Sequence, residues 1–421
     1  MERCKRVIME ALYECAAGLD VHLATVMACR RRLMGQGQVE VEVREFGTTT
    51  GELRGLGEWL AEWGVTHVAM ESTGVLWQPV WNVLEGRFKL LLVNAQHLKK
   101  VPGRKTDVTD AEWIAQCMQC GLLRGSFVPP EQVREWRDLT RQRMKLVDHH
   151  TAVVNRVHKV LQRGNIKLSS VASDVMGVSG RAMLRAMIEG ESDPARLAEL
   201  ARGRLRRKRA ELVPSLEGHL SEHQRWLLRR LLGEVEFLER EITAYDERLE
   251  ELMRPFEAAL QRLDTIDGLG RRGAENVLAE LGPDMEPFPS SDDVTSWSGI
   301  CPGNKESAGK RRSGRTPGGN RWLRRVLVGA AWAGIKTKNS YLGAQYRRLA
   351  ARRGQKRAIV AVGRTILVAA YHILKEEVEY RDLGGDYFDR LNEEKTKRHL
   401  VKRLEKLGYQ VELTRSERAV A

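Results

Sequence analysis

Four acidic residues early in the chain have the types and spacing of a metal-binding set. Asp20 lies within the apolar segment Ala16–Cys29, and Glu71 ends a short apolar run. Asp107 and Asp110 are three residues apart, a spacing that places both carboxylates on one face at the start of a helix. A carboxylate in a strand is costly to bury unless it is paired or bound to a metal. The alternatives are an N-cap role for Asp107, a loop position for Glu71 and a turn position for Asp20.

The order of these acids along the chain indicates which kind of reaction they would serve. An acid on the first strand, another at the end of a later strand and a third on a following helix is the order of the ribonuclease-H-like fold. That arrangement brings carboxylates together around two Mg²⁺ ions about 4 Å apart, which activate an oxygen nucleophile and stabilise the leaving oxygen. The sequence therefore predicts phosphoryl-transfer chemistry at a site that binds Mg²⁺, with Mn²⁺ as the alternative cation.

A second candidate region is the basic, glycine-rich segment Pro302–Arg325. It contains eight Lys or Arg against one acid, Glu306, so this segment carries half of the net charge of +14. Its glycines allow a close backbone approach to a phosphate, whereas a solvated surface loop is the alternative. The predicted nucleic-acid-binding cations are Lys305, Lys310, Arg311, Arg312, Arg315, Arg321, Arg324 and Arg325.

Ser307 lies within this basic segment. A serine among cations can attack a phosphodiester while Arg and Lys stabilise the pentavalent phosphorus; the simpler alternative is a hydrogen bond to a phosphate. Upstream, Leu263–Gly270 has helix-hairpin-helix spacing, in which the hairpin at Gly268 and Gly270 would hold a phosphate backbone without reading sequence. A plain helical hairpin is the alternative there.

Hydrophobic periodicity indicates which elements position these residues. Alternating strands and helices in the first part predict a mixed sheet with helices on its faces. The expected strands are Ala16–Cys29, Gln38–Phe46, Val65–Met70 and Phe88–Val93, and the expected helices are Leu53–Trp63, Leu76–Leu84 and Asp107–Cys120.

The middle of the chain is predicted to be helical. Glu131–Leu161 has the pattern of one long amphipathic helix, and 164–215 that of a less regular helical insert with a run of cations between Arg202 and Arg209. From Leu228 to Leu252 apolar residues recur in steps of three and four, which predicts a coiled coil within the chain or between protomers. The fold class expected is α/β plus α.

Composition limits the class of partner. The 421 residues include 70 Lys and Arg against 56 Asp and Glu, an excess that favours a polyanion, although a soluble enzyme that is merely basic is the alternative. No apolar run approaches the roughly 20 residues needed to cross a bilayer, so no membrane partner is expected. The six cysteines are sparse and are expected to be free thiols, with Cys117 and Cys120 as packing residues.

Taken jointly, the motifs resemble the DEDD transposases of bacterial insertion sequences, of the insertion-sequence one-ten type, which are related to the Piv DNA invertases. The resemblance covers nearly the whole chain. In this chain the family's Ser-Gly step reads Ser-Ala-Gly, and Glu306 is an unusual acid beside the serine. The matching stretches are Gly18–His22, Glu71–Gly74, Val93–Gln96, Lys105–Ala111, Ile266–Gly270, Gly299–Pro302, Ser307–Lys310 and Arg321–Arg325.

The resemblance implies a domain order and residue roles. Residues 1–128 would form a RuvC-type, ribonuclease-H-like catalytic domain, 129–262 a helical and coiled-coil connector, 263–385 a mainly helical transposase domain, and 386–421 a charged tail. Asp20, Glu71, Asp107 and Asp110 would be catalytic and bind the metal, and Ser307 would become covalently linked to DNA.

We therefore expect a recombinase that cuts and rejoins DNA strands of its own mobile element. The implied partners are double-stranded DNA at the element ends and target, a structured noncoding guide (bridge) RNA, and further copies of the chain as a dimer and, on DNA, a tetramer. The expected location is the cytoplasm, at the nucleoid. The alternatives are a metal-dependent endonuclease or Holliday-junction resolvase, a Piv-like invertase, and a non-catalytic architectural or RNA-binding protein.

Overall fold

The chain folds into two compact units, Met1–Val128 and Pro129–Ala421. The structure is a computed structural model. It describes residues 11–34, 38–72, 74–98, 101, 109–303, 305–307, 310–313, 316 and 318–414.

A five-stranded mixed sheet forms the centre of the first unit, with strand order β3-β2-β1-β4-β5. β1 pairs antiparallel with β2 and parallel with β4, β2 pairs antiparallel with β3, and β4 pairs parallel with β5. The α/β class expected for this part of the chain is confirmed. The strands are β1 (Cys15–Val21), β2 (Thr25–Leu33), β3 (Val39–Gly47), β4 (His67–Glu71) and β5 (Lys89–Val93).

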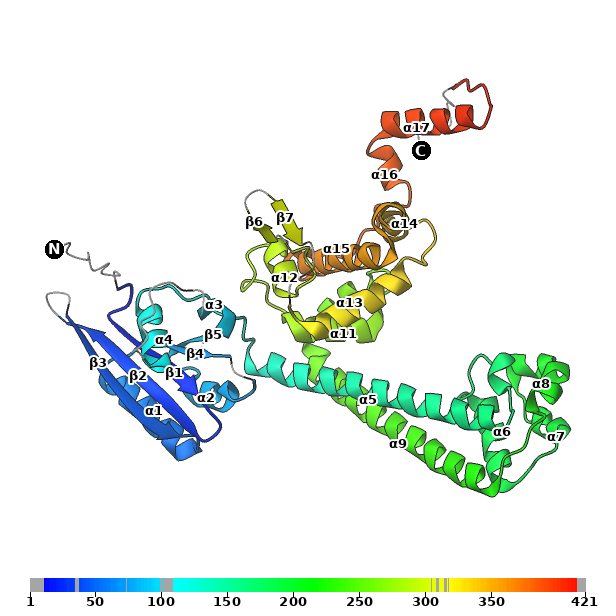
Figure 1. The fold of residues 1–421 in the computed structure, drawn as a ribbon, viewed down its shortest axis with the longest axis horizontal. Coiled ribbons are helices and arrows are strands. Elements are labelled where there is room, and N and C mark those ends of the chain that lie inside the picture. Colours follow the sequence, from blue (N-terminus) through cyan, green and yellow to red (C-terminus); the bar gives the residue numbers. More distant parts are fainter. Residues whose placement is uncertain are drawn as a thin grey trace. The chain divides into compact units, whose positions relative to one another are not determined.

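Helices cover both faces of the sheet (Figure 1). On one face, Leu19, Val68 and Met70 pack into a core with apolar residues of α1 (Thr50–Glu62) and α2 (Trp77–Leu84). On the other face, α4 (Asp110–Gln119) packs against Ala16, Ala69 and Cys29. The short helix α3 (Ala95–Leu98) follows β5. The central strands are therefore buried on both sides, as parallel strands usually are.

Gly18 allows α4 to lie directly against β1. A Cβ atom at this position would stand 2.3 Å from the Ala115 nitrogen and 2.4 Å from the Ala111 oxygen, both backbone atoms. Any side chain would therefore push the helix away from the sheet.

The prediction of one strand over Ala16–Cys29 is wrong. The chain reverses between β1 and β2 in a tight turn, where the His22 N–H donates to the Thr25 carbonyl at 2.9 Å. Apolar residues continue on both sides of this turn, so hydrophobic pattern alone did not reveal it. Asp20 consequently lies one residue before the end of β1, and not in mid-strand as expected.

The second unit contains two long helices, α5 (Glu131–Arg163) and α9 (Glu222–Met253), which pack side by side (Figure 1). The long helix expected over Glu131–Leu161 is confirmed. Most of the apolar positions predicted to form a seam on α9 are buried, and the seam packs against α5 of the same chain. A helical insert joins the two helices: η2 (Leu168–Ser170), α6 (Val178–Glu189), α7 (Pro194–Glu199), η3 (Gly203–Lys208) and α8 (Arg209–Leu216).

The rest of the second unit is a helical bundle with one small β-hairpin. Within the described residues, α15 (Gln355–Glu376) is the one helix long and apolar enough to cross a membrane, but 56% of its most apolar window is buried. It packs against α12 (Ser291–Trp297), α13 (Arg321–Gly334) and α14 (Tyr341–Arg353) as a core helix and does not indicate a membrane span. The elements are η4 (Arg254–Phe256), α10 (Glu257–Asp264), α11 (Gly270–Leu281), α12 (Ser291–Trp297), β6 (Lys305–Ser307), β7 (Lys310–Ser313), α13 (Arg321–Gly334), α14 (Tyr341–Arg353), α15 (Gln355–Glu376), α16 (Tyr387–Arg390) and α17 (Glu393–Lys406).

The close contact at Gly18 yields a stability prediction. Gly18→Ala is expected to lower the free energy of unfolding by about 1–3 kcal/mol, because the new methyl group meets backbone that cannot rotate away. Urea denaturation followed by circular dichroism measures the change. As a control, Gly55→Ala on the exposed face of α1, where a Cβ meets nothing within 4 Å, should stabilise the chain by about 0.5–1 kcal/mol. Equal stability of Gly18→Ala and the unmodified protein would contradict the account.

Candidate catalytic and nucleic-acid sites

Two of the predicted metal ligands lie side by side at the carboxyl ends of β1 and β4. These strands are parallel, and their last registered pair is Leu19 with Met70, so Asp20 and Glu71 each follow by one residue. Leu19 and Met70 are buried in the core under α1. Because successive side chains of a strand point to opposite faces, Asp20 and Glu71 both face the α4 side of the sheet.

The start of α4 lies at the same end of the sheet. The Leu12 N–H donates to the Gln119 carbonyl at 2.8 Å, which places the end of α4 near the beginning of β1. The helix therefore runs antiparallel to β1, and its first residue, Asp110, lies toward the end of β1 where Asp20 stands. Thr109 caps the helix in a capping box with Glu112. The N-cap is thus Thr109 and not Asp107, which had been the structural alternative for that aspartate.

Asp20 lies beside a histidine of its own hairpin. His22 Nε2 lies 3.2 Å from Asp20 Oδ2, and the Asp20 side chain is 24% exposed. Asp20 is therefore accessible from solvent but already held by an imidazole that carries charge only when protonated. Glu71 and Asp110 also make interactions of their own.

The donor set suits a hard divalent cation, because Asp20, Glu71 and Asp110 offer carboxylate oxygens at one end of the sheet. Yet no three His, Cys, Asp or Glu side chains in the described ranges lie close enough together to hold a metal ion. Asp107, the fourth predicted ligand, lies outside those ranges. The donor chemistry and the shared location thus fit the predicted metal. The described acids do not by themselves form a complete set of ligands around one metal position.

None of the five described cysteines has a catalytic arrangement. All five described cysteines are free, as expected. Burial raises the pKa of the Cys117 thiol to about 12. Burial also raises the pKa of the Cys120 thiol. A thiol held protonated is a poor nucleophile and metal ligand. Cys117 packs in the core under α4, and half-buried Cys120 caps the end of that helix.

Ser307 lies in the hairpin of β6 and β7, in the second unit. The backbone register pairs Ser307 with Lys310 and Lys305 with Ser313, with an irregularity between Lys305 and Glu306. Of the predicted cations, Lys305, Lys310, Arg311 and Arg312 belong to these two strands, whereas Arg315 lies outside the described residues. The positions therefore bring the serine and four predicted cations into one hairpin.

The two ends of this basic segment meet at a pair of glycines. A Cβ on Gly319 would lie 2.4 Å from the Gly299 nitrogen, and one on Gly299 would lie 2.9 Å from the Gly319 Cα. Gly299 also has φ +71°, a conformation that favours glycine. This backbone contact brings together the residues before and after the β6–β7 hairpin.

A buried carboxylate that the sequence reasoning missed holds the end of that segment. Asn320 caps α13 by accepting hydrogen bonds from the Trp322 and Leu323 N–H groups, and its side-chain amide donates to Glu280 Oε2 at 2.6 Å. The Glu280 side chain is 1% exposed and also receives two hydrogen bonds of 2.8 Å from Arg141 of α5.

Arg137 completes the Glu280 cluster, which we define as Glu280, Arg137, Arg141 and Asn320. Its guanidinium lies 3.4 Å from Glu280 Oε2 and donates to the Ala279 carbonyl at 3.1 Å. Burial lowers the pKa of Arg137 to about 10, partly offset by the charge of Glu280. The only available signal was the four-residue spacing of Arg137 and Arg141, which indicates a shared helix face but not its partner.

The predicted cations of α13 differ in availability. Arg325 forms a bidentate ion pair with Asp148 of α5, which lowers the pKa of the Asp148 carboxyl and raises that of Arg325. Arg321 lies 4.8 Å from the ring of Trp322. Arg325 is thus compensated within the chain, whereas Arg321 and Arg324 make no ion pair with any described residue.

The predicted helix-hairpin-helix consists of α10, the turn 265–269 and α11. A Cβ on Gly268 would lie 2.2 Å from the Gly334 nitrogen, so this face of the turn packs on the backbone of α13. Gly270 has open space around it. The Tyr380 N–H donates to Thr265 Oγ1 at 3.0 Å, so the chain after α15 also contacts this turn. Of the two glycines predicted to hold a phosphate, only Gly270 is open.

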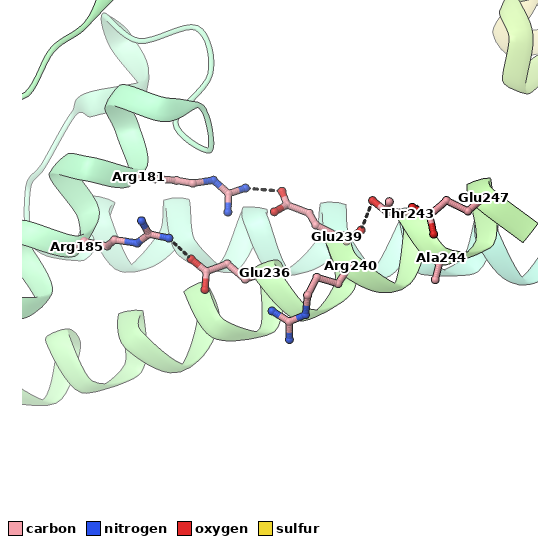
Figure 2. Close-up of a pocket in the computed structure, with 8 residues that line it drawn as sticks. All are labelled: Arg181, Arg185, Glu236, Glu239, Arg240, Thr243, Ala244 and Glu247. Atoms are coloured by element: carbon pink, nitrogen blue, oxygen red, sulfur yellow. Dashed lines mark hydrogen bonds and ion pairs between the residues drawn. The ribbon is translucent and has the colours of Figure 1, made fainter.

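A pocket of about 510 Å³ lies between α6 and α9 (Figure 2). Figure 2 shows Arg181 and Arg185 of α6 pointing at Glu239 and Glu236 of α9. Arg185 Nη2 stands 2.6 Å from Glu236 Oε1. The paired charges neutralise one another and link the two helices. The ion-paired residues therefore present no net charge to a ligand in the pocket.

Comparison with known proteins adds an independent finding. A family model described as "Transposase", of the IS110 DEDD type, matches residues 17–166. A second, described as "Transposase IS116/IS110/IS902 family", matches residues 260–347. The first stretch contains the four acids, and the second contains Ser307 and the Glu280 cluster members Glu280 and Asn320.

Two relatives illustrate the similarity. A Pseudomonas aeruginosa protein named "Probable family 20 transposase" is 27% identical over 323 residues, which cover 76% of this chain and 80% of the relative. The "Transposase for insertion sequence element IS1111A" of Coxiella burnetii is 26% identical over 298 residues, covering 69% of this chain and 72% of the relative.

The Glu280 cluster yields a stability prediction. Glu280→Gln is expected to lower the free energy of unfolding by about 3–5 kcal/mol, because it leaves buried arginine charge without its carboxylate. Chemical denaturation provides the measurement. Glu251→Gln is the matched control, because Glu251 is exposed and pairs with Arg248 on one helix, and it should change stability by less than about 0.5 kcal/mol. Equal effects of the two changes would refute the role of the cluster.

Proposed function

The chain belongs to the IS116/IS110/IS902 family of transposases, and from this premise we propose that it cuts and rejoins DNA strands to excise and insert its own mobile element. Membership rests on two family models that together match more than half of the chain and on transposase relatives that align over most of it. We place the activity in the cytoplasm, at the nucleoid.

The observation that carries the proposal is the shared location of Asp20, Glu71 and Asp110. Two parallel strands and one antiparallel helix bring these acids to one end of the sheet. The mixed five-stranded sheet with helices on both faces supports a ribonuclease-H-like, RuvC-type fold for this unit. We propose that these three residues and Asp107 hold Mg²⁺, which would supply charge stabilisation to the reacting phosphate oxygens.

We propose that Ser307 is the nucleophile. Its hydroxyl loses a proton as Oγ bonds to phosphorus, the P–O3′ bond breaks, and the departing 3′-oxygen takes up a proton. The product is a phosphoserine link to the 5′ end, and attack by another 3′-hydroxyl reverses the step and rejoins the strands. Cations of the hairpin would stabilise the charge of the pentavalent phosphorus.

One rival function keeps the acids but not the serine. In a metal-dependent endonuclease or Holliday-junction resolvase, water would be the nucleophile and Ser307 would only contact a phosphate. A Piv-like invertase, by contrast, would use the same chemistry on a different DNA arrangement. The matched transposase relatives favour transposition over both.

Trapping the covalent intermediate tests the serine role. Ser307→Ala is expected to abolish protein–DNA adducts on element-end DNA and to leave DNA binding intact. Ser313→Ala is the matched control, because Ser313 lies in the partner strand of the same basic hairpin, and it should retain the adduct. Denaturing electrophoresis of labelled DNA detects the link, and an adduct that survives Ser307→Ala rejects the nucleophile.

The same assay examines the acids. Asp20→Asn should stop strand cleavage, with a loss of at least about 100-fold, because it removes charge needed for the metal. Glu58→Gln, on the α1 face of the sheet and ion-paired with Arg87, is the control and should cleave normally. Full Mg²⁺-dependent cleavage by Asp20→Asn would exclude this site.

We further propose that a structured noncoding RNA of the element guides the enzyme and that it works as a dimer that pairs into a tetramer on DNA. The basic excess of the chain supports a second polyanionic partner. Sequencing the nucleic acid that co-purifies with the protein should recover one RNA from beside the gene. Recovery of random cellular RNA alone would count against guidance while leaving the recombinase proposal intact.

A further inference from the structure

The sequence from Tyr341 to Lys375 contains no Asp or Glu. It contains eight Lys or Arg, and six of them fall within residues 347–357, at the end of α14 and the beginning of α15. None of these six was among the residues predicted to bind nucleic acid. The positive charge of the second unit therefore has a concentration apart from the Ser307 hairpin.

Part of this charge lines a groove of about 620 Å³ formed by α14, α16 and α17. We call it the α14–α17 groove. Asp389 is the only acid among its lining residues. The basic side chains that line it are Arg347, Arg348, Arg352, Lys395 and His399.

Aromatic contacts hold the far wall of the groove in place. Tyr341 of α14 stacks on Phe388 with ring centroids 5.2 Å apart and meets Tyr387 edge-on at 5.1 Å. The guanidinium of Arg348 lies 4.9 Å from the centre of the Phe388 ring. The short helix α16 is therefore packed on α14, and α17 continues from it (Figure 1).

The arginines and the lysine of the groove differ from other cations of the chain in their ion pairing. Across the described ranges, neither Arg347, Arg348 and Arg352 nor Lys395 forms an ion pair. The pocket of Figure 2 is the opposite case, because there Arg181 and Arg185 are each matched by a glutamate. Like charges held in one groove repel, and an anion that enters it removes that cost.

We propose that the α14–α17 groove binds the sugar-phosphate backbone of duplex DNA. Arginine guanidinium groups suit phosphate oxygens, and basic side chains outnumber the other polar side chains of the lining. Binding there is therefore independent of sequence and holds DNA that flanks the reacting phosphate. This inference rests on the proposed function, which supplies DNA as the substrate.

The test compares two charge-matched triple variants of the full chain. The groove variant is Arg347→Gln, Arg352→Gln and Lys395→Gln, which spares the Arg348 contact with Phe388. The control is Arg185→Gln, Arg229→Gln and Arg248→Gln, three exposed arginines that each pair with a glutamate. Binding to an element-end duplex and to an unrelated duplex is measured without Mg²⁺ over a range of salt concentrations.

The groove variant should bind both duplexes about 10-fold more weakly, and its salt slope should fall by about 2–3, since each phosphate contact contributes about 0.9. The control should lose less than about 2-fold, because its arginines are compensated. Asp389→Asn removes the single acid and should strengthen binding by about 2-fold, a gain that misfolding does not produce.

Two results overturn the inference: equal losses in the groove and control variants, or a loss confined to one duplex sequence. Each of these leaves the proposed function standing if the unmodified protein cleaves element ends. If the unmodified protein neither binds nor cleaves element-end DNA, the groove inference and the proposed function are both wrong. Normal cleavage by the groove variant at saturating DNA would show that the groove acts in binding and not in the chemical step.

Discussion

The close approach of α4 to β1 at Gly18 is the constraint on which the acidic site depends. Because this residue has no side chain, the helix backbone contacts the strand directly. The hydrogen bond from the Leu12 N–H to the Gln119 carbonyl places the end of α4 near the beginning of β1. Asp110 consequently stands at the end of the sheet where Asp20 and Glu71 emerge. A carboxylate on a helix N-terminus is favoured by the helix dipole, so the same geometry that packs the helix also suits the acid.

The second unit uses an equivalent solution for the serine-bearing segment. The contact of Gly299 with Gly319 closes the base of the segment, and Asn320 connects it to buried Glu280. Burial of a carboxylate is costly. Arg137 and Arg141 of α5 offset this cost only when their guanidinium groups lie within contact distance of Glu280. The contact and the cap thus tie residues on either side of the β6–β7 hairpin to the bundle.

Charge in this chain has two distinct uses. Between α6 and α9, each arginine forms an ion pair with a glutamate. These pairs link the two helices and neutralise the charge of both partners. Where arginine forms no ion pair with a described residue, as in the α14–α17 groove, its charge is not offset by a neighbouring carboxylate. Net charge alone does not separate these uses, because both arginine populations contribute equally to the excess of +14.

The sequence by itself predicted most strands and helices of the first unit and the family, because hydrophobic period and short motifs are local properties. The metal-binding role of the four acids stays a prediction. Only the tertiary structure decided the turn at His22, the cap at Thr109, the packing of Gly268 on α13 and the pairing of Arg325 with Asp148. It also revealed Glu280. The packing of Gly268, the pairing of Arg325 and the burial of Glu280 depend on partners many residues away, which no local pattern records. The turn and the cap are local, and the competition among neighbouring residues decided them.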